Sequence, residues 1–144
     1  MAGEPAPLPA PLLAALSDRD EVLVTSRAGT RTGTVPMAFA IAPPGVLYLL
    51  TSAFSRKAGR WESDPWVRLT VPGTGDSVEG TVRRLTADEI DAPAEEAVLA
   101  RFPDAGAATP EALRQLLATG THRLFRVEAA PAGPPDSAPP AASR

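Results

Sequence analysis

Short apolar runs alternate with turn sequences along most of the chain. In residues 34–41, TVPMAFAI, the larger apolar side chains recur at every second position, the period of a strand with one buried face. Pro36 lacks an amide hydrogen, which indicates an edge strand or a bulge at that point. Five further strands are predicted from β-branched and apolar runs at 21–27, 46–51, 66–71, 77–85 and 121–129.

Helical signals lie outside these strands. Thr86 and Glu89 have the spacing of a capping box, which predicts the start of a helix. A parallel sheet would need a helix between each pair of strands, and the sequence lacks them. The pattern therefore favours a mostly β fold, an antiparallel β-barrel with added helices. The helices are predicted near 11–20, 56–63 and 87–101, with one more from Thr109-Pro110-Glu111 to Gly120.

The two ends of the chain differ in composition from its middle. Residues 2–11 contain four prolines and residues 129–144 contain five, mixed with Ala, Ser and Gly. Such segments bury too little apolar surface to offset the entropy of ordering. We therefore expect a flexible segment at 1–11, one domain at 12–128 and a disordered tail at 129–144.

Composition excludes several classes of function. The 144 residues carry a net charge of -3, so a general affinity for nucleic acid is not expected. The chain has no cysteine and one histidine, His122, which argues against disulfides and against the usual metal sites. Since no apolar stretch is long enough for a bilayer and the N-terminus lacks a basic signal-peptide region, a soluble cytoplasmic protein is expected.

The segment from Thr51 to Asp64-Pro65 carries the clearest candidate chemistry. Ser55 is predicted to cap a helix over 56–63 that stops before Asp64-Pro65. Arg56 and Lys57, the only lysine in the chain, fall in its first turn, where cations oppose the helix dipole. An anion such as phosphate, held between these cations and the free backbone amides, would explain their position.

Hydroxyl groups next to this turn strengthen the prediction of an anion site. Thr51 and Ser52, at the end of the preceding strand, can donate hydrogen bonds to the same anion. The alternative is a solvated surface turn in which Glu62 and Asp64 neutralise the two cations. Spacing alone leaves both interpretations open.

The segment LLTSAFSRKAGRWESDPWVRLTV resembles the FMN-binding segment of the pyridoxamine phosphate oxidase-like split barrels. VEGTVRRLTADE is similar to the next strand and helix of that family, and GTRTGTVPMAFAI to its second strand. The resemblance covers roughly residues 20–128. It implies a six-stranded, Greek-key-like split barrel that forms a homodimer, with the flavin at the interface and residues from both chains around it.

The resemblance also assigns roles to individual residues. Arg56 and Lys57 would hold the FMN phosphate, with Thr51, Ser52 and the capping Ser55 beside it. The backbone of Val35, Pro36 and Met37 would run along the isoalloxazine ring. The implied function is that of an FMN-dependent oxidoreductase acting on an unidentified small molecule, and no catalytic side chain is assigned.

Two alternatives stay open at this point. A sister branch of the same fold uses the deazaflavin coenzyme F-420, and the chain also resembles that branch in having a lysine in this loop. A flavin-binding protein without turnover, such as a sensor, is the other alternative.

The basic residues that bind the vitamin substrate in pyridoxamine phosphate oxidase itself are not matched in this chain. His122, Arg123 and Arg126 only weakly resemble the late Arg-x-His motif of that enzyme, because they occur in a different order.

Overall fold

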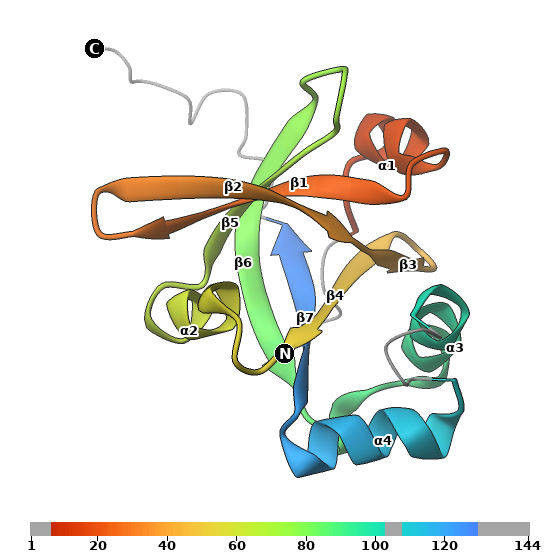
Figure 1. Cartoon of the computed structure of the whole chain (residues 1–144). Coiled ribbons are helices and arrows are strands. Elements are labelled where there is room, and N and C mark those ends of the chain that lie inside the picture. Colours follow the sequence, from red (N-terminus) through yellow and green to blue (C-terminus); the bar gives the residue numbers. More distant parts are fainter. Residues whose placement is uncertain (1–6, 103–107, 130–144) are drawn as a thin grey trace, which may run out of the picture.

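The computed structural model describes residues 7–102 and 108–129, which form a curled antiparallel sheet with helices around it (Figure 1). The strand order is β2-β1-β5-β6-β7-β4-β3. The mostly β fold class is confirmed. The strands are β1 (Glu21–Ala28), β2 (Arg31–Ala38), β3 (Ala40–Ala42), β4 (Val46–Ser52), β5 (Trp66–Thr70), β6 (Ser77–Leu85) and β7 (His122–Ala129). The helices are α1 (Ala10–Leu16), α2 (Arg56–Ser63), α3 (Ala92–Arg101) and α4 (Pro110–Thr119), with a 3-10 turn at Ala87–Glu89.

The single strand predicted at 34–41 is two strands, so the sheet has seven strands rather than six. β2 pairs with β1, whereas β3 pairs with β4. These two strands are the opposite edges of the sheet, and the chain passes from one to the other at Phe39, which is buried. The alternation of apolar residues continues across this corner, which is why the sequence pattern does not reveal it.

The helix predicted over 87–101 is also divided. The capping box is present, with the amide of Thr86 donating to the Glu89 carboxylate at 2.8 Å, but it opens only the 3-10 turn. A second start follows at Asp91, whose side chain accepts from the amide of Ala94 at 2.9 Å. Pro93 explains the break, because proline disrupts a helix interior but fits a first turn.

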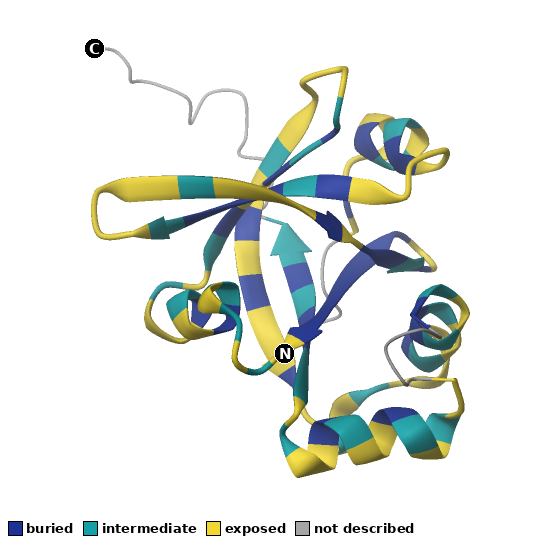
Figure 2. Ribbon diagram, viewed as in Figure 1, coloured by how far each residue is buried: buried dark blue, intermediate teal, exposed yellow. Residues whose placement is uncertain are grey.

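Two apolar cores lie on the two faces of the sheet. Leu47 and Leu49 of β4 face the inside of the barrel, while Tyr48 and Leu50 face α3 and α4 on the outside. Because both faces of β4 are covered, all of its residues except Ser52 are buried. Figure 2 shows this contrast between β4 and β6, on which buried and exposed residues alternate.

The packed domain begins earlier than residue 12. Leu8 is buried, and its amide donates to the carbonyl of Gly45 at 2.9 Å. The helix predicted in 11–20 spans Ala10–Leu16 and packs Leu12 and Leu16 on the barrel core. The expectations for residues 1–6 and 130–144 lie outside the described residues.

Gly80 in β6 is required by the close approach of its neighbours. It pairs with Val67 of β5 and Ala129 of β7. A Cβ at this position would lie 2.4 Å from the carbonyl oxygen of Glu128. Since that atom belongs to the backbone, it cannot turn away as a side chain could.

Candidate functional site

The turn between β4 and α2 has the predicted local structure. α2 begins at Arg56 and ends at Ser63, as expected. The Ser55 hydroxyl oxygen accepts from the amide of Ala58 at 3.2 Å, and the buried Thr51 donates to it at 3.3 Å. Thr51 therefore holds the capping residue in place from the end of the strand.

The first turn of α2 presents two cations, Arg56 and Lys57. Arg56 is exposed and Lys57 is half-buried, and neither has a carboxylate within 4 Å among the residues that the structure describes. Within the same residues, their backbone amides have no acceptor. Two side-chain cations and two free amides at one helix start are the groups that bind an anion.

The nearby acids are engaged elsewhere. Glu62 forms an ion pair with Arg123 of β7, and Asp64 accepts from Arg27 of β1 at 2.7 and 3.3 Å. The interpretation in which Glu62 and Asp64 neutralise the cations of the first turn is therefore wrong. Both carboxylates join α2 to the barrel, and neither forms an ion pair with Arg56 or Lys57.

The Arg27–Asp64 pair predicts a pH dependence of stability. The hydrogen bond from Arg27 is the main cause that holds the pKa of Asp64 below its ordinary value of 3.8. Because folding lowers its pKa, the Asp64 carboxylate stabilises the folded state at pH values above its ordinary pKa. This stabilisation is lost as the pH falls through the folded-state pKa. Asp64→Asn should therefore lower the free energy of unfolding at pH 7, and the difference from the wild type should shrink below pH 4.

Urea unfolding between pH 3 and pH 7 measures this difference. Glu96→Gln is the control, since Glu96 is exposed on α3 and forms no ion pair with a described residue. A difference between Asp64→Asn and wild type that stays constant over the whole pH range would contradict the prediction.

The residues predicted to line the flavin ring lie on an edge strand. Among the described strands β2 pairs only with β1, which confirms the edge position that Pro36 indicates. Val35 and Pro36 are exposed, and Met37 is buried. Since successive side chains of a strand alternate, Val35 and Met37 share the inner face of the sheet, opposite to Pro36.

Ser52 lies at the other side of the predicted site. Its hydroxyl oxygen accepts from the amide of Phe54 at 3.2 Å, and it pairs across the sheet with His122 of β7. Phe54 is 88% exposed, and Val35 on β2 is 39% exposed. In the single chain the predicted site is therefore an open surface, on which Phe54 and Val35 expose large apolar side chains.

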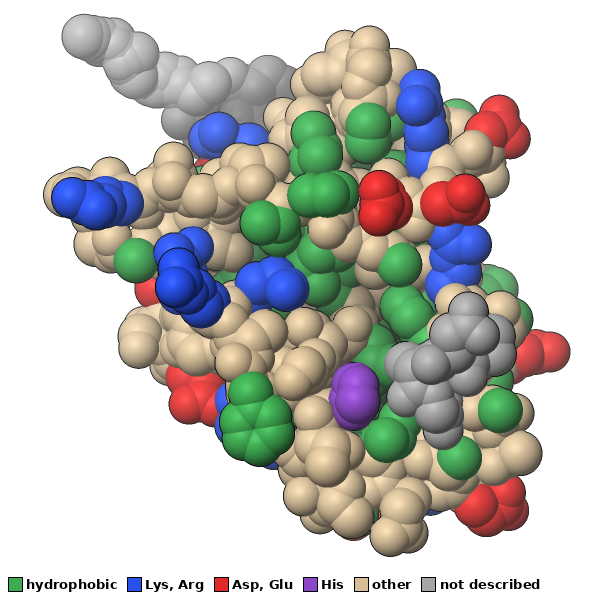
Figure 3. Space-filling model, viewed as in Figure 1, with side chains coloured by type: hydrophobic (Ala, Val, Ile, Leu, Met, Phe, Trp, Pro, Cys, Tyr) green, Lys and Arg blue, Asp and Glu red, His purple; other side chains and the backbone are tan. Residues whose placement is uncertain are grey.

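Two cations of this region are absent from the sequence-based prediction. Arg60, on the next turn of α2, has no carboxylate partner in the described ranges. Its spacing of four residues from Arg56 could have placed it on the same face of the predicted helix. Arg123 lies opposite Thr51 in the β4–β7 pairing, with its Nε atom buried and unpaired among the described residues. No local pattern indicates that position. Figure 3 shows basic side chains gathered over α2 and the adjoining end of β2.

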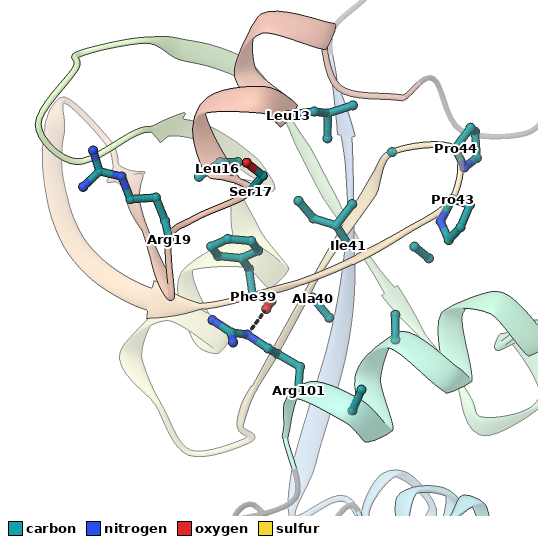
Figure 4. A pocket seen from close by; sticks show the side chains of 14 residues that line it. Leu13, Leu16, Ser17, Arg19, Phe39, Ala40, Ile41, Pro43, Pro44 and Arg101 are labelled. Carbon is teal, nitrogen blue, oxygen red and sulfur yellow. Dashed lines mark hydrogen bonds between the residues drawn. The ribbon is translucent and has the colours of Figure 1, made fainter.

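A cavity of about 620 Å³ lies elsewhere, between α1, β3 and α3 (Figure 4). Leu13, Phe39 and Ile41 point into it, and Arg101 closes one side by donating to the carbonyl of Phe39 at 2.9 Å. None of the predicted cofactor residues lines this cavity. The site predicted from the sequence and this cavity are therefore different places in the molecule.

No group of three or more His, Cys, Asp or Glu side chains could hold a metal ion in residues 7–102 and 108–129. In those ranges, no helix is long and apolar enough to cross a membrane.

No family model matches the sequence, and no curated protein matches it. Solved structures do. A candidate pyridoxamine 5′-phosphate oxidase from Listeria innocua superposes with a TM-score of 0.59 at 14% identity, covering 83% of this chain and 90% of that one. The chain has the split-barrel fold. This split barrel is thus built like the pyridoxamine 5′-phosphate oxidase-like proteins, as the resemblance implies.

The names of two other structural neighbours refer to different groups, heme and FAD. The heme storage protein HutZ from Vibrio cholerae has a TM-score of 0.59 at 16% identity, covering 88% of this split barrel and 93% of its own chain. An FAD-binding protein from Mesorhizobium loti has a TM-score of 0.56 at 19% identity, covering 83% and 85%. This chain shares its fold with all three of these proteins.

Proposed function

We propose that the split barrel binds FMN between α2 and the edge strand β2 and acts as a flavin-dependent oxidoreductase on a small molecule. The observation that carries the proposal is the start of α2. Arg56 and Lys57 have no carboxylate partner there among the described residues, because Glu62 and Asp64 bind Arg123 and Arg27. Neighbours whose names refer to pyridoxamine phosphate oxidation and FAD binding support a flavin.

The donor set fits a phosphate group. Arg56 offers a planar guanidinium, Lys57 a compact charge, and the two free amides complete the cradle. Ser52 is exposed beside them and can donate its hydroxyl hydrogen. Thr51 and Ser55, already bonded to each other, keep the cap of α2 in its binding geometry rather than reaching the phosphate.

The chain's own residues would bind and orient the cofactor, which itself supplies the electron or hydride transfer. The backbone of Val35, Pro36 and Met37 on the edge strand β2 would run along the ring. Backbone groups face the free edge at every second residue, and Pro36 has no amide hydrogen to donate. We propose that a second copy of the chain covers this open surface, because Phe54 and Val35 expose apolar side chains beside the polar groups.

Absorption spectroscopy of the purified protein, followed by fluorescence titrations with FMN and with F-420, tests the proposal. Tight binding of FMN, and reduction of the bound flavin by a nicotinamide donor, is the expected result. Preference for F-420 would leave the proposed phosphate site at the start of α2 in place and change the chemistry to hydride transfer by a deazaflavin. Binding without reduction would indicate a sensor or carrier, and binding of neither cofactor would overturn the proposal.

A further inference from the structure

The side chain of Arg60, on α2, lies close to Gly33 on the edge strand β2. If Gly33 carried a Cβ, that atom would lie 3.2 Å from Nη1 of Arg60, tighter than an ordinary contact. Gly33 has no positive φ, so its backbone conformation would accept a side chain. A side chain at this position would therefore meet the guanidinium of Arg60, which would have to shift to make room for it.

The charges around Arg60 make this contact unusual. Arg56 and Arg60 are four residues apart, so they share one face of α2, where like charges repel each other. Lys57 adds a third charge in the same helix. Of the carboxylates that the structure describes, none lies within 4 Å of these three cations, although seven other ion pairs form. An anion would remove the repulsion.

We propose that Arg60 is a third ligand of the cofactor phosphate and that Gly33 is a glycine because it admits this side chain. The inference rests on the proposed function, since it concerns the same phosphate. Three cations match a terminal phosphomonoester, which carries close to two negative charges at neutral pH. The site should therefore prefer a flavin with such a group over one without it.

Titrations of the full-length chain with FMN and with riboflavin, which lacks the phosphate, test this role. Arg60→Gln should weaken FMN binding at least tenfold and leave riboflavin binding unchanged, because a charge-assisted contact to the phosphate is lost. Gly33→Ala should weaken FMN binding in the same direction, since its Cβ displaces the guanidinium. Arg19→Gln, which removes an exposed charge near α1, should change neither.

The outcomes separate this inference from the proposed function. If Arg60→Gln binds FMN like the wild type while Lys57→Ala does not, Arg60 is no phosphate ligand and the FMN site stands. If Arg60→Gln weakens FMN and riboflavin equally, the side chain acts on the ring or the fold and the inference is overturned. If the wild type binds neither flavin, both proposals fail. Thermal unfolding of each variant checks that the barrel is intact.

Discussion

Replacing Trp61 with alanine is expected to lower the free energy of unfolding by about 3–5 kcal/mol, the usual cost of removing a buried aromatic side chain. Trp61 is 4% exposed and packs edge-to-face on Phe125, with ring centroids 4.8 Å apart. Its Nε1 atom donates to the hydroxyl of buried Ser26 at 3.0 Å. The alanine variant would lose the packing and also leave Ser26 without this donor.

Urea unfolding of Trp61→Ala beside Trp66→Ala measures this effect. Trp66 is half-buried on the outer side of the sheet, where the guanidinium groups of Arg27 and Arg68 stack on its ring. Trp66→Ala should therefore lower the free energy of unfolding clearly less than Trp61→Ala does. Trp61→Phe keeps an aromatic ring and removes the hydrogen bond to Ser26. Its free energy of unfolding should lie between those of the wild type and Trp61→Ala. Equal losses for the two alanine variants would show that Trp61 is not the residue that joins α2 to the barrel core.

Replacing Lys57 with alanine is expected to weaken FMN binding at least tenfold, or roughly 1.4 kcal/mol. The ammonium group is a charge-assisted donor to the proposed phosphate, and no other lysine can replace it. The fold should survive, because Lys57 makes no ion pair with a described residue and is only half-buried. Fluorescence titration gives the dissociation constant.

Riboflavin and a distant variant are the controls for Lys57→Ala. Riboflavin binding should be the same in the variant and the wild type, since the phosphate contact does not exist there. Arg114→Ala removes a cation that pairs with Glu95 on the far helices α3 and α4, and it should leave FMN binding unchanged. Unchanged FMN affinity in Lys57→Ala would contradict the assignment of this residue as a phosphate anchor.

Features that depend on neighbouring residues were predictable from the sequence. The cap at Ser55, the end of α2 before Asp64-Pro65 and the start of α4 after Thr109 follow from side chains within a few residues of each backbone group. The strands were predicted for the same reason, since their pattern is local. The division between β2 and β3 at Phe39 was missed because it is made by pairing with two different strands.

The candidate site divides in the same way. The sequence by itself determined the group from Thr51 to Lys57, because a strand end, a cap and a helix start are consecutive in the chain. Only the tertiary structure decided that these cations have no carboxylate partner within residues 7–102 and 108–129. Glu62 pairs with Arg123, 61 residues away, and Asp64 pairs with Arg27, 37 residues away. It also brought Arg60 against Gly33. Local spacing cannot show which distant charges meet, because the folding of the sheet determines that choice.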